Sequence, residues 1–250
     1  MSLRWPALLL VLLLTGCAGL DKGDDSSSLE SDENSPANTW VQLAAEYYRM
    51  GDYAAALGKA KKAVQKDPRN ANAYLILGLI YEAIGEIDQA QTAYRKARGI
   101  DDRNPYVLNA YGRLLCQLDE YEKSLQAFDK ALQNPLYETP WVALGNAGVC
   151  ALAAGNQLRA EKYFLRALQE NPRFPLALAQ MARISYEQGK YLSARAYIQR
   201  YREVARPTAQ LLYLSILTER KLGNKDQERS DELLLKAEYP DSEEARKLAR

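Results

Sequence analysis

Large apolar residues recur three and four positions apart along most of this chain, in pairs of stretches separated by a glycine. The stretch 71–104 shows this most clearly, because residues 74–81 are almost wholly apolar, Gly85 follows, and Tyr94 continues the helical spacing. The pattern predicts two amphipathic helices joined by a tight turn. Gly85 is expected to adopt the left-handed conformation that ends the first helix, and Gly78 to be small where the two helix backbones meet. One hairpin cannot bury both apolar stripes, so similar hairpins are expected on either side.

The turn position recurs at a nearly constant interval. Most steps are 34 residues and one is 36, and the positions are Gly51, Gly85, Asp119, Gly155, Gly189 and Gly223. A 34-residue period with an aromatic residue, a leucine and a glycine in the first helix and a small residue in the second resembles the tetratricopeptide repeat (TPR). We therefore predict an all-α fold, a right-handed superhelical solenoid of six TPR helical hairpins with a short C-terminal capping helix. The hairpins are expected at 37–70, 71–104, 105–140, 141–174, 175–208 and 209–242, and the cap at 243–250.

The last hairpin departs from the pattern. Glu228 occupies the position where the other second helices carry a small residue. A change toward polar residues is typical of the terminal repeat of a solenoid. Ser242 is expected to cap a short, solvent-facing helix at the end of the chain.

Composition argues against catalysis and nucleic-acid binding. The chain has 250 residues, 26% of them charged, and no histidine, so the usual general base and the commonest metal ligand are missing. No nucleophile and base pair, metal-ligand set or phosphate loop can be assembled from the remaining residues. The prediction is a non-enzyme without cofactor, metal or small-molecule substrate. The balance of 33 basic and 32 acidic side chains gives no basic excess for nucleic acid.

Residues 1–16 have the pattern of a signal peptide, with a basic start at Arg4 and an apolar run too short to span a bilayer. The following segment Leu14-Thr15-Gly16-Cys17 resembles the bacterial lipobox. The resemblance implies cleavage before Cys17 and acylation of that cysteine, and Ala18 after it favours transfer to the outer membrane. An ordinary signal peptide with an incidental cysteine is the alternative.

Residues 17–36 are expected to form a flexible tether behind the lipidated cysteine. The segment is rich in aspartate, glutamate and serine and has few sizeable apolar residues, so it cannot offset the entropy of becoming ordered. The helical body is thus predicted to face the periplasm of a Gram-negative bacterium from a lipid anchor in the outer membrane.

An apolar surface on the first two hairpins is the candidate partner site. Val41, Ala45 and Tyr48 lie on the side of the first helix expected to face inward, and Leu75 and Leu79 occupy the equivalent side of the next hairpin. Burying such side chains in a partner is favourable, so we predict protein binding here. The sequence leaves open whether these residues are exposed, pack against one another, or are covered by the tether.

Two further cysteines, Cys116 and Cys150, fall on the first helices of adjacent hairpins. Their levels along nearly parallel helices are expected to differ by about 3 Å. In an oxidising periplasm this arrangement favours a disulfide. Two separate buried thiols are the alternative.

Taken together, these features resemble the type IV pilus biogenesis lipoproteins of the PilF/PilW family. The segments that carry the resemblance besides the lipobox and repeats are 108–116, 134–137, 146–150 and 191–195. The resemblance implies a secretin pilotin, an outer-membrane lipoprotein that binds the pilus secretin subunit and promotes its localisation and multimerisation, and hence twitching motility. A TPR lipoprotein scaffold for another envelope assembly, such as outer-membrane protein assembly or cell-wall remodelling, is the alternative.

Overall fold

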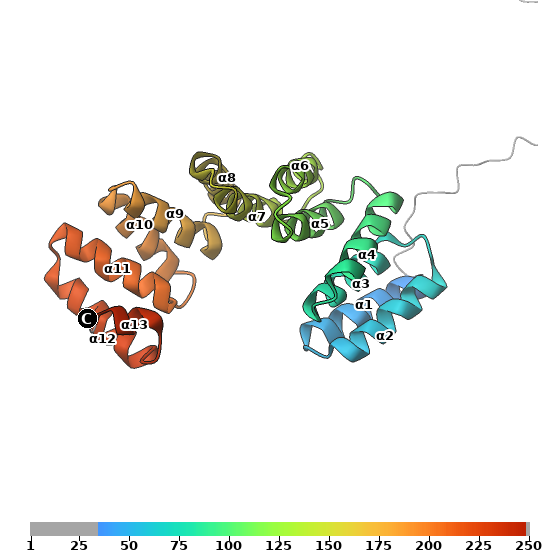
Figure 1. The fold of residues 1–250 in the computed structure, drawn as a ribbon, viewed down its shortest axis with the longest axis horizontal. Helices are drawn as coiled ribbons and strands as arrows, with labels where there is room; N and C mark the ends of the chain where they lie inside the picture. Colours follow the sequence, from blue (N-terminus) through green and yellow to red (C-terminus); the bar gives the residue numbers. More distant parts are fainter. Residues whose placement is uncertain (1–34, 249–250) are drawn as a thin grey trace, which may run out of the picture. The chain divides into compact units, whose positions relative to one another are not determined.

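The structure, a computed structural model, describes residues 35–248, and every regular element in that part of the chain is a helix (Figure 1). The helices, in chain order, are α1 (Pro36–Arg49), α2 (Tyr53–Lys66), α3 (Ala71–Ala83), α4 (Ile87–Ile100), α5 (Pro105–Gln117), α6 (Tyr121–Ala131), α7 (Pro140–Ala153), α8 (Gln157–Glu170), α9 (Pro175–Glu187), α10 (Tyr191–Arg202), α11 (Ala209–Leu222), α12 (Lys225–Glu238) and α13 (Glu243–Leu248). The expected signal peptide and almost all of the expected tether lie outside the described residues.

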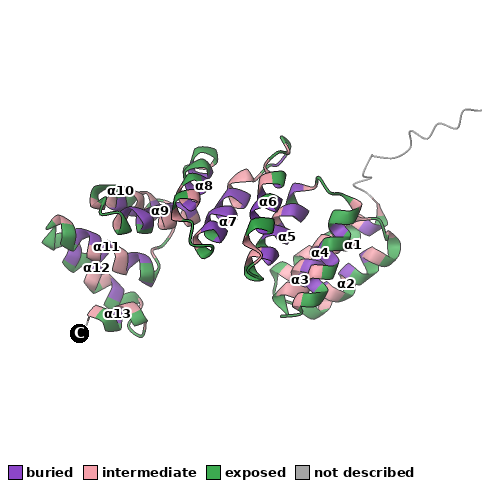
Figure 2. Cartoon of the chain, turned by 45° about the horizontal axis from the view of Figure 1, so that its top comes forward, coloured by how far each residue is buried: buried purple, intermediate pink, exposed green. Residues whose placement is uncertain are grey.

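Successive helices form six antiparallel hairpins, from α1 with α2 to α11 with α12. The second helix of each hairpin also contacts the first helix of the next, and α1, α3, α5 and α7 contact one another in turn. Figure 2 shows the buried residues on the faces where neighbouring helices meet. The predicted all-α solenoid is therefore confirmed, and each hairpin begins within one residue of its expected start.

The turn inside each hairpin depends on one residue with a positive φ angle. The six are Gly51 (79°), Gly85 (82°), Asp119 (60°), Gly155 (74°), Gly189 (72°) and Gly223 (74°). Glycine adopts this conformation without a steric penalty, whereas other residues do so at some cost. Asp119 is the one exception among the described turns, and its carboxylate accepts a hydrogen bond of 2.6 Å from the Tyr121 hydroxyl. The residue that recurs every 34 or 36 positions in the sequence is thus the residue with positive φ in each turn, as expected.

Glycines in the first helices have a different role from the one predicted for Gly78. A Cβ atom on Gly78 would lie 2.4 Å from Cε1 of Tyr94, so the glycine makes room for an aromatic ring and not for a helix backbone. Two later hairpins repeat the arrangement. The equivalent pairs are Gly112 with Phe128 and Gly148 with Phe164. All three rings are fully buried, so the second, third and fourth hairpins each close around a ring seated on a glycine.

The sixth hairpin is not simply a polar, exposed end of the solenoid. Glu228 is buried, and its Oε1 accepts a hydrogen bond of 2.6 Å from Nε of Arg220. This bond holds the pKa of Glu228 below its usual range. Asp231 is also buried and accepts hydrogen bonds from Ser215 (2.6 Å) and Arg202 (2.8 Å). The hairpin therefore buries two carboxylates, and each is paired with an arginine.

The two ends of the helical body are capped by serines. The Ser35 hydroxyl accepts a hydrogen bond from the amide of Asn38, so α1 begins at Pro36, the last residue expected in the tether. At the other end the Ser242 hydroxyl accepts from the amide of Ala245, as predicted. The prediction of a solvent-facing helix is wrong on one side of α13, because Ala245 is buried against α11 and α12.

We expect Gly78→Ala to lower the free energy of unfolding by about 1–3 kcal/mol, because the new methyl group overlaps the Tyr94 ring. Gly58→Ala is the matched control. Gly58 lies within α2 with no atom near the added Cβ, so alanine there should stabilise by up to about 1 kcal/mol. Urea unfolding followed by circular dichroism measures both, and equal stability of the two variants would contradict the seating of the ring on Gly78.

Candidate partner-binding surface

The five residues predicted to bind a partner come from two first helices that touch each other, α1 and α3. Val41, Ala45 and Tyr48 lie one turn apart along α1, and Leu75 and Leu79 hold the corresponding positions in α3. All five side chains are half-buried. We call this set the α1–α3 patch.

The patch is supported from beneath by two hydrophobic clusters. Val41, Ala45, Tyr48 and Leu79 pack on the cluster centred on the first hairpin, whose members are Ala44, Ala56, Ala60, Ile76 and Ile80. Leu75 and Leu79 pack on the next cluster, which contains Tyr94. Leu79 touches both clusters, so the patch is continuous across the two hairpins. The five residues therefore pack on the core beneath them and still keep exposed surface.

An ion pair between a largely covered carboxylate and an exposed guanidinium forms one edge of the patch. Glu82 follows Leu75 and Leu79 on the same side of α3, and only 9% of its side chain is exposed. Its carboxylate receives both guanidinium nitrogens of Arg113 from α5, at 2.5 and 3.0 Å, and the hydroxyl of Tyr94 at 2.9 Å. A bidentate guanidinium with a third donor satisfies a carboxylate removed from water. The edge of the patch is therefore held in a single arrangement.

The tyrosines at this edge remain protonated at physiological pH. Burial raises the pKa of Tyr94 far above its ordinary value, and the neighbouring Glu82 carboxylate raises it further. Burial likewise raises the pKa of Tyr48, with Glu82 and Tyr53 adding to the effect and Arg113 opposing it. Both phenols are thus neutral, and Tyr94 is always available to donate to Glu82.

Sequence reasoning missed Glu82 and Arg113. Their signal was present in the repeat register, because Glu82 occupies the position of Tyr48 and Arg113 that of Leu79 one hairpin later. An acid and a base at neighbouring positions on adjacent first helices are candidates for an ion pair. The spacing of apolar residues predicts an apolar face, but it carries no information about the charged residues at the edge of that face.

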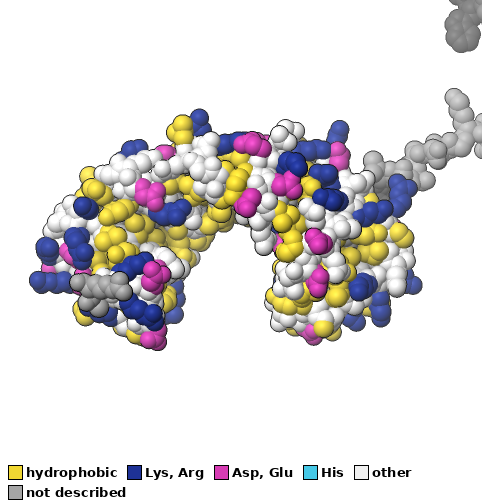
Figure 3. All heavy atoms as spheres, viewed as in Figure 1, with side chains coloured by type: hydrophobic (Ala, Val, Ile, Leu, Met, Phe, Trp, Pro, Cys, Tyr) yellow, Lys and Arg dark blue, Asp and Glu magenta, His cyan; other side chains and the backbone are white. Residues whose placement is uncertain are grey.

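The repeat positions that form the α1–α3 patch are occupied by apolar residues again in later hairpins. Val149 and Leu152 of α7, and Tyr213 and Leu217 of α11, correspond to patch residues, and Val149 is 39% exposed. Figure 3 shows hydrophobic side chains gathered over α7 to α11 in this view. Polar residues separate them from the α1–α3 patch, among them Asn109, which accepts a hydrogen bond of 2.9 Å from Asn146.

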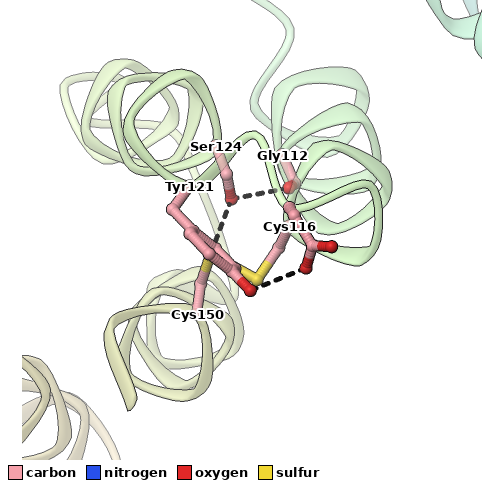
Figure 4. The surroundings of a disulfide bond; sticks show 6 residues. Gly112, Cys116, Tyr121, Ser124 and Cys150 are labelled. Atoms are coloured by element: carbon pink, nitrogen blue, oxygen red, sulfur yellow. Dashed lines mark hydrogen bonds between the residues drawn. A yellow bond between two sulfur atoms is a disulfide. The ribbon is translucent and has the colours of Figure 1, made fainter. Parts of the chain in front are cut away.

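Cys116 of α5 and Cys150 of α7 are joined by a disulfide, with their Cα atoms 5.7 Å apart (Figure 4). Ser124 of α6 donates a hydrogen bond of 2.7 Å to the carbonyl oxygen of Gly112, and its Oγ lies 3.2 Å from Sγ of Cys150. The Tyr121 ring lies beside the two sulfurs. The bond therefore links the third and fourth hairpins at the point where the repeat spacing changes from 34 to 36 residues.

Residues 35–248 contain no group of three or more histidine, cysteine or acidic side chains placed to hold a metal ion. None of the helices in the same range is both long enough and apolar enough to cross a bilayer. Cys17, the predicted lipid-attachment residue, lies outside the described residues.

Comparisons with known proteins agree with this architecture. A family model described as "Tetratricopeptide repeat" matches residues 47–114. Over 238 residues the chain is 30% identical to the type IV pilus assembly protein PilF of Pseudomonas aeruginosa, covering 94% of each chain. The solved structure of that PilF superposes with a TM-score of 0.80, covering 85% of this chain and 96% of that one.

A second solved structure, PilW, described as a widely conserved type IV pilus biogenesis factor, is 34% identical. It superposes with a TM-score of 0.77 and covers 86% of this chain and 98% of that chain. A tetratricopeptide repeat protein from Parabacteroides merdae, 22% identical with a TM-score of 0.60, shares the fold.

Removing the disulfide with Cys116→Ser and Cys150→Ser should lower the free energy of unfolding by about 3–4 kcal/mol, because the bond closes a loop of 34 residues in the unfolded chain. Thermal unfolding with and without a reductant measures this. The reductant should lower the melting temperature of the wild-type protein and leave the double variant unchanged. Detection of two free thiols in unreduced, denatured wild-type protein would contradict the bond.

Proposed function

This chain belongs to the PilF/PilW family of type IV pilus TPR proteins, and from that we propose that it is a pilotin for the pilus secretin. In this role it is an outer-membrane lipoprotein that binds the secretin subunit and promotes its localisation and multimerisation, on which pilus biogenesis and twitching motility depend. The observation that carries the proposal is near full-length similarity to two pilus biogenesis proteins. The TPR hairpin stack, a protein-interaction fold, supports binding in place of catalysis.

The proposed anchor is a lipid on Cys17. The tetrapeptide Leu14-Thr15-Gly16-Cys17 ends a short apolar run, as in bacterial lipoproteins. Several acyl chains, each CH₂ contributing roughly 0.8 kcal/mol, hold a protein on a bilayer almost irreversibly. We expect the residues between Cys17 and the start of α1 at Pro36 to act as a tether, and a flexible coil of that length would have a root-mean-square reach of roughly 24 Å. The helical body then works within a short distance of the membrane surface.

The proposed binding surface for the secretin is the α1–α3 patch. Its side chains keep part of their apolar area exposed, and covering that area with a partner is favourable at roughly 25 cal/mol per Å². The ion pair of Glu82 and Arg113 restricts the patch at one end, so a partner segment has an apolar stretch to cover and a polar edge to match. Side chains of the α1–α3 patch are held by two packed helices, so they lose little conformational entropy when a partner binds.

The first test of the function uses cells with and without this protein. After membrane fractionation, the heat-resistant secretin multimer is followed by immunoblot. If this protein is a pilotin, its removal should make the multimer disappear or leave the secretin subunits in the inner membrane.

Complementation with the wild-type gene is the positive control, and Cys17→Ser should fail to restore outer-membrane multimers although its body folds. An unaffected multimer in the deletion strain would reject the pilotin role and favour a scaffold for another envelope assembly. Outer-membrane fractionation of Cys17→Ser would reject the lipid anchor.

Leu75→Asp combined with Leu79→Asp should weaken secretin capture by more than tenfold, since two apolar contacts become charged groups that must be desolvated. Capture of the purified secretin subunit by immobilised protein measures the effect. Leu158→Asp with Leu192→Asp is the matched control, because these leucines of α8 and α10 are 68% and 69% exposed.

Leu79 also packs on two clusters, so the milder variant Leu75→Gln tests the same surface with less risk to the fold. Helicity by circular dichroism should match the wild type in every variant compared. Undiminished capture by well-folded patch variants would place the secretin site elsewhere.

A further inference from the structure

Positive charge is concentrated on the second helices of the first two hairpins. α2 carries four lysines and no acidic residue, and α4 carries three basic residues and one aspartate. The later second helices are different. α6 has two basic and two acidic residues, α8 has three basic and two acidic residues, and α12 has three basic and five acidic residues. Three arginines lie in α10, but Arg195 and Arg202 are paired with Glu219 and Asp231.

The charges on α2 and α4 are exposed and available. We define the basic face as Lys61, Lys62 and Lys66 of α2 together with Arg95, Lys96 and Arg98 of α4, all of which are exposed. Among residues 35–248, no carboxylate pairs with any of the six. Two contact aromatic rings, since Lys62 lies 4.8 Å from the Trp40 ring and Arg98 lies 4.7 Å from that of Tyr111. Their charge is not neutralised by these contacts.

The repeat places four of these residues at matching positions of the two second helices. Lys61 and Arg95 are 34 residues apart and so occupy the same position in successive hairpins, as do Lys62 and Lys96. In Figure 3, Lys and Arg side chains are seen over the hairpins of α1 to α4. Favourable interaction with the helix dipole accounts for a base in the last turn, such as Lys66, but not for Lys61 or Arg95, which lie farther from the helix ends.

We propose that the basic face binds the anionic phospholipid headgroups of the membrane that holds the Cys17 lipid. The proposal rests on the anchor proposed above, because the hairpins that carry the face are the ones next to the anchored end of the chain. A lysine or arginine contributes to membrane binding only within about a Debye length of the surface, roughly 8–10 Å at physiological salt. The anchor brings the first hairpins to that surface, and the basic face then sets which side of the body is turned toward it.

The chain itself contains one competing occupant. Residues 18–34 include six acidic residues and one lysine, so this segment also has the charge to cover the basic face. The lipid surface is favoured because it presents anionic groups across both helices at once and at high density. The test separates the two occupants.

The test measures sedimentation with vesicles and needs neither the lipid nor the secretin. The proteins are residues 18–250 and residues 35–250, the second being the compact helical unit by itself. The vesicles are phosphatidylcholine alone, or phosphatidylcholine with about 30% phosphatidylglycerol. Both proteins should bind the anionic vesicles and not the neutral ones, and salt should abolish the binding.

The basic-face variant is Lys61→Glu, Lys66→Glu and Arg95→Glu, none of which contacts an aromatic ring or a carboxylate in the described structure. Its partition onto anionic vesicles should fall at least about tenfold. The matched control makes the same change in net charge with Lys162→Glu, Arg166→Glu and Lys236→Glu, which are exposed residues of α8 and α12. The control should keep most of the binding, and circular dichroism checks the fold of both.

Equal losses in the two variants would overturn the proposal, since net charge and not the basic face would then control binding. Binding by residues 35–250 but not by residues 18–250 would also overturn it, because the acidic segment would be the occupant. Absence of binding by both proteins at low salt would overturn it outright. None of these outcomes bears on the secretin multimer, so the two proposals can fail separately.

Discussion

The second, third and fourth hairpins depend on a fit between one position of the first helix and the residue sixteen places later in the second helix. Where the second helix has an aromatic ring, the first helix has glycine, as in Gly78 with Tyr94. In the first and fifth hairpins the first-helix residue is alanine, and the residue sixteen places later is Ala60 or Ile198, both buried. A close-packed interior tolerates neither a void nor an overlap of one methyl group, so the two helices can approach only if the pair is matched. This contact sets the distance between the two helices of a hairpin, and that distance determines where the next hairpin can pack.

The spacing brings first helices of successive hairpins into contact, and this creates the features of the candidate site. Leu79 can touch the clusters of two hairpins only because α1, α3 and α5 lie side by side. The same proximity allows Arg113 to reach Glu82 on the preceding first helix, and Cys116 to reach Cys150 on the following one. An apolar patch, its polar edge and the disulfide are therefore successive contacts along one row of helices.

The two kinds of helix present different chemistry. First helices carry the half-buried apolar residues on which the proposed secretin site is built, whereas the outer positions of α2 and α4 carry exposed bases. At the other end of the chain, acidic residues take the place of small ones, and Glu228 and Asp231 are buried with arginine partners. Burial of a charge is tolerated there because each carboxylate receives a guanidinium. Exposed bases thus gather on the first two hairpins, whereas the last hairpin buries two of its carboxylates.

Much of this protein was determined by periodicity alone. The 34-residue repeat, the turn glycines and the Ser242 cap follow from residue types at fixed spacing, because backbone conformation is decided over a few residues. The nearness of Cys116 and Cys150 also followed from the register, although only the structure joins their sulfurs. The repeat register likewise located the α1–α3 patch, but whether its side chains were open or covered depended on their neighbours.

Only the tertiary structure determined the contacts between helices, because these depend on which side chains meet when the helices pack. The ring over Gly78, the bidentate pair of Glu82 with Arg113 and the buried carboxylate of Glu228 each require a partner from another helix. A periodic pattern places a residue on a face but does not choose its rotamer or the group it contacts. That choice is made by packing and by the need of every buried charge for a partner, which only the folded chain supplies.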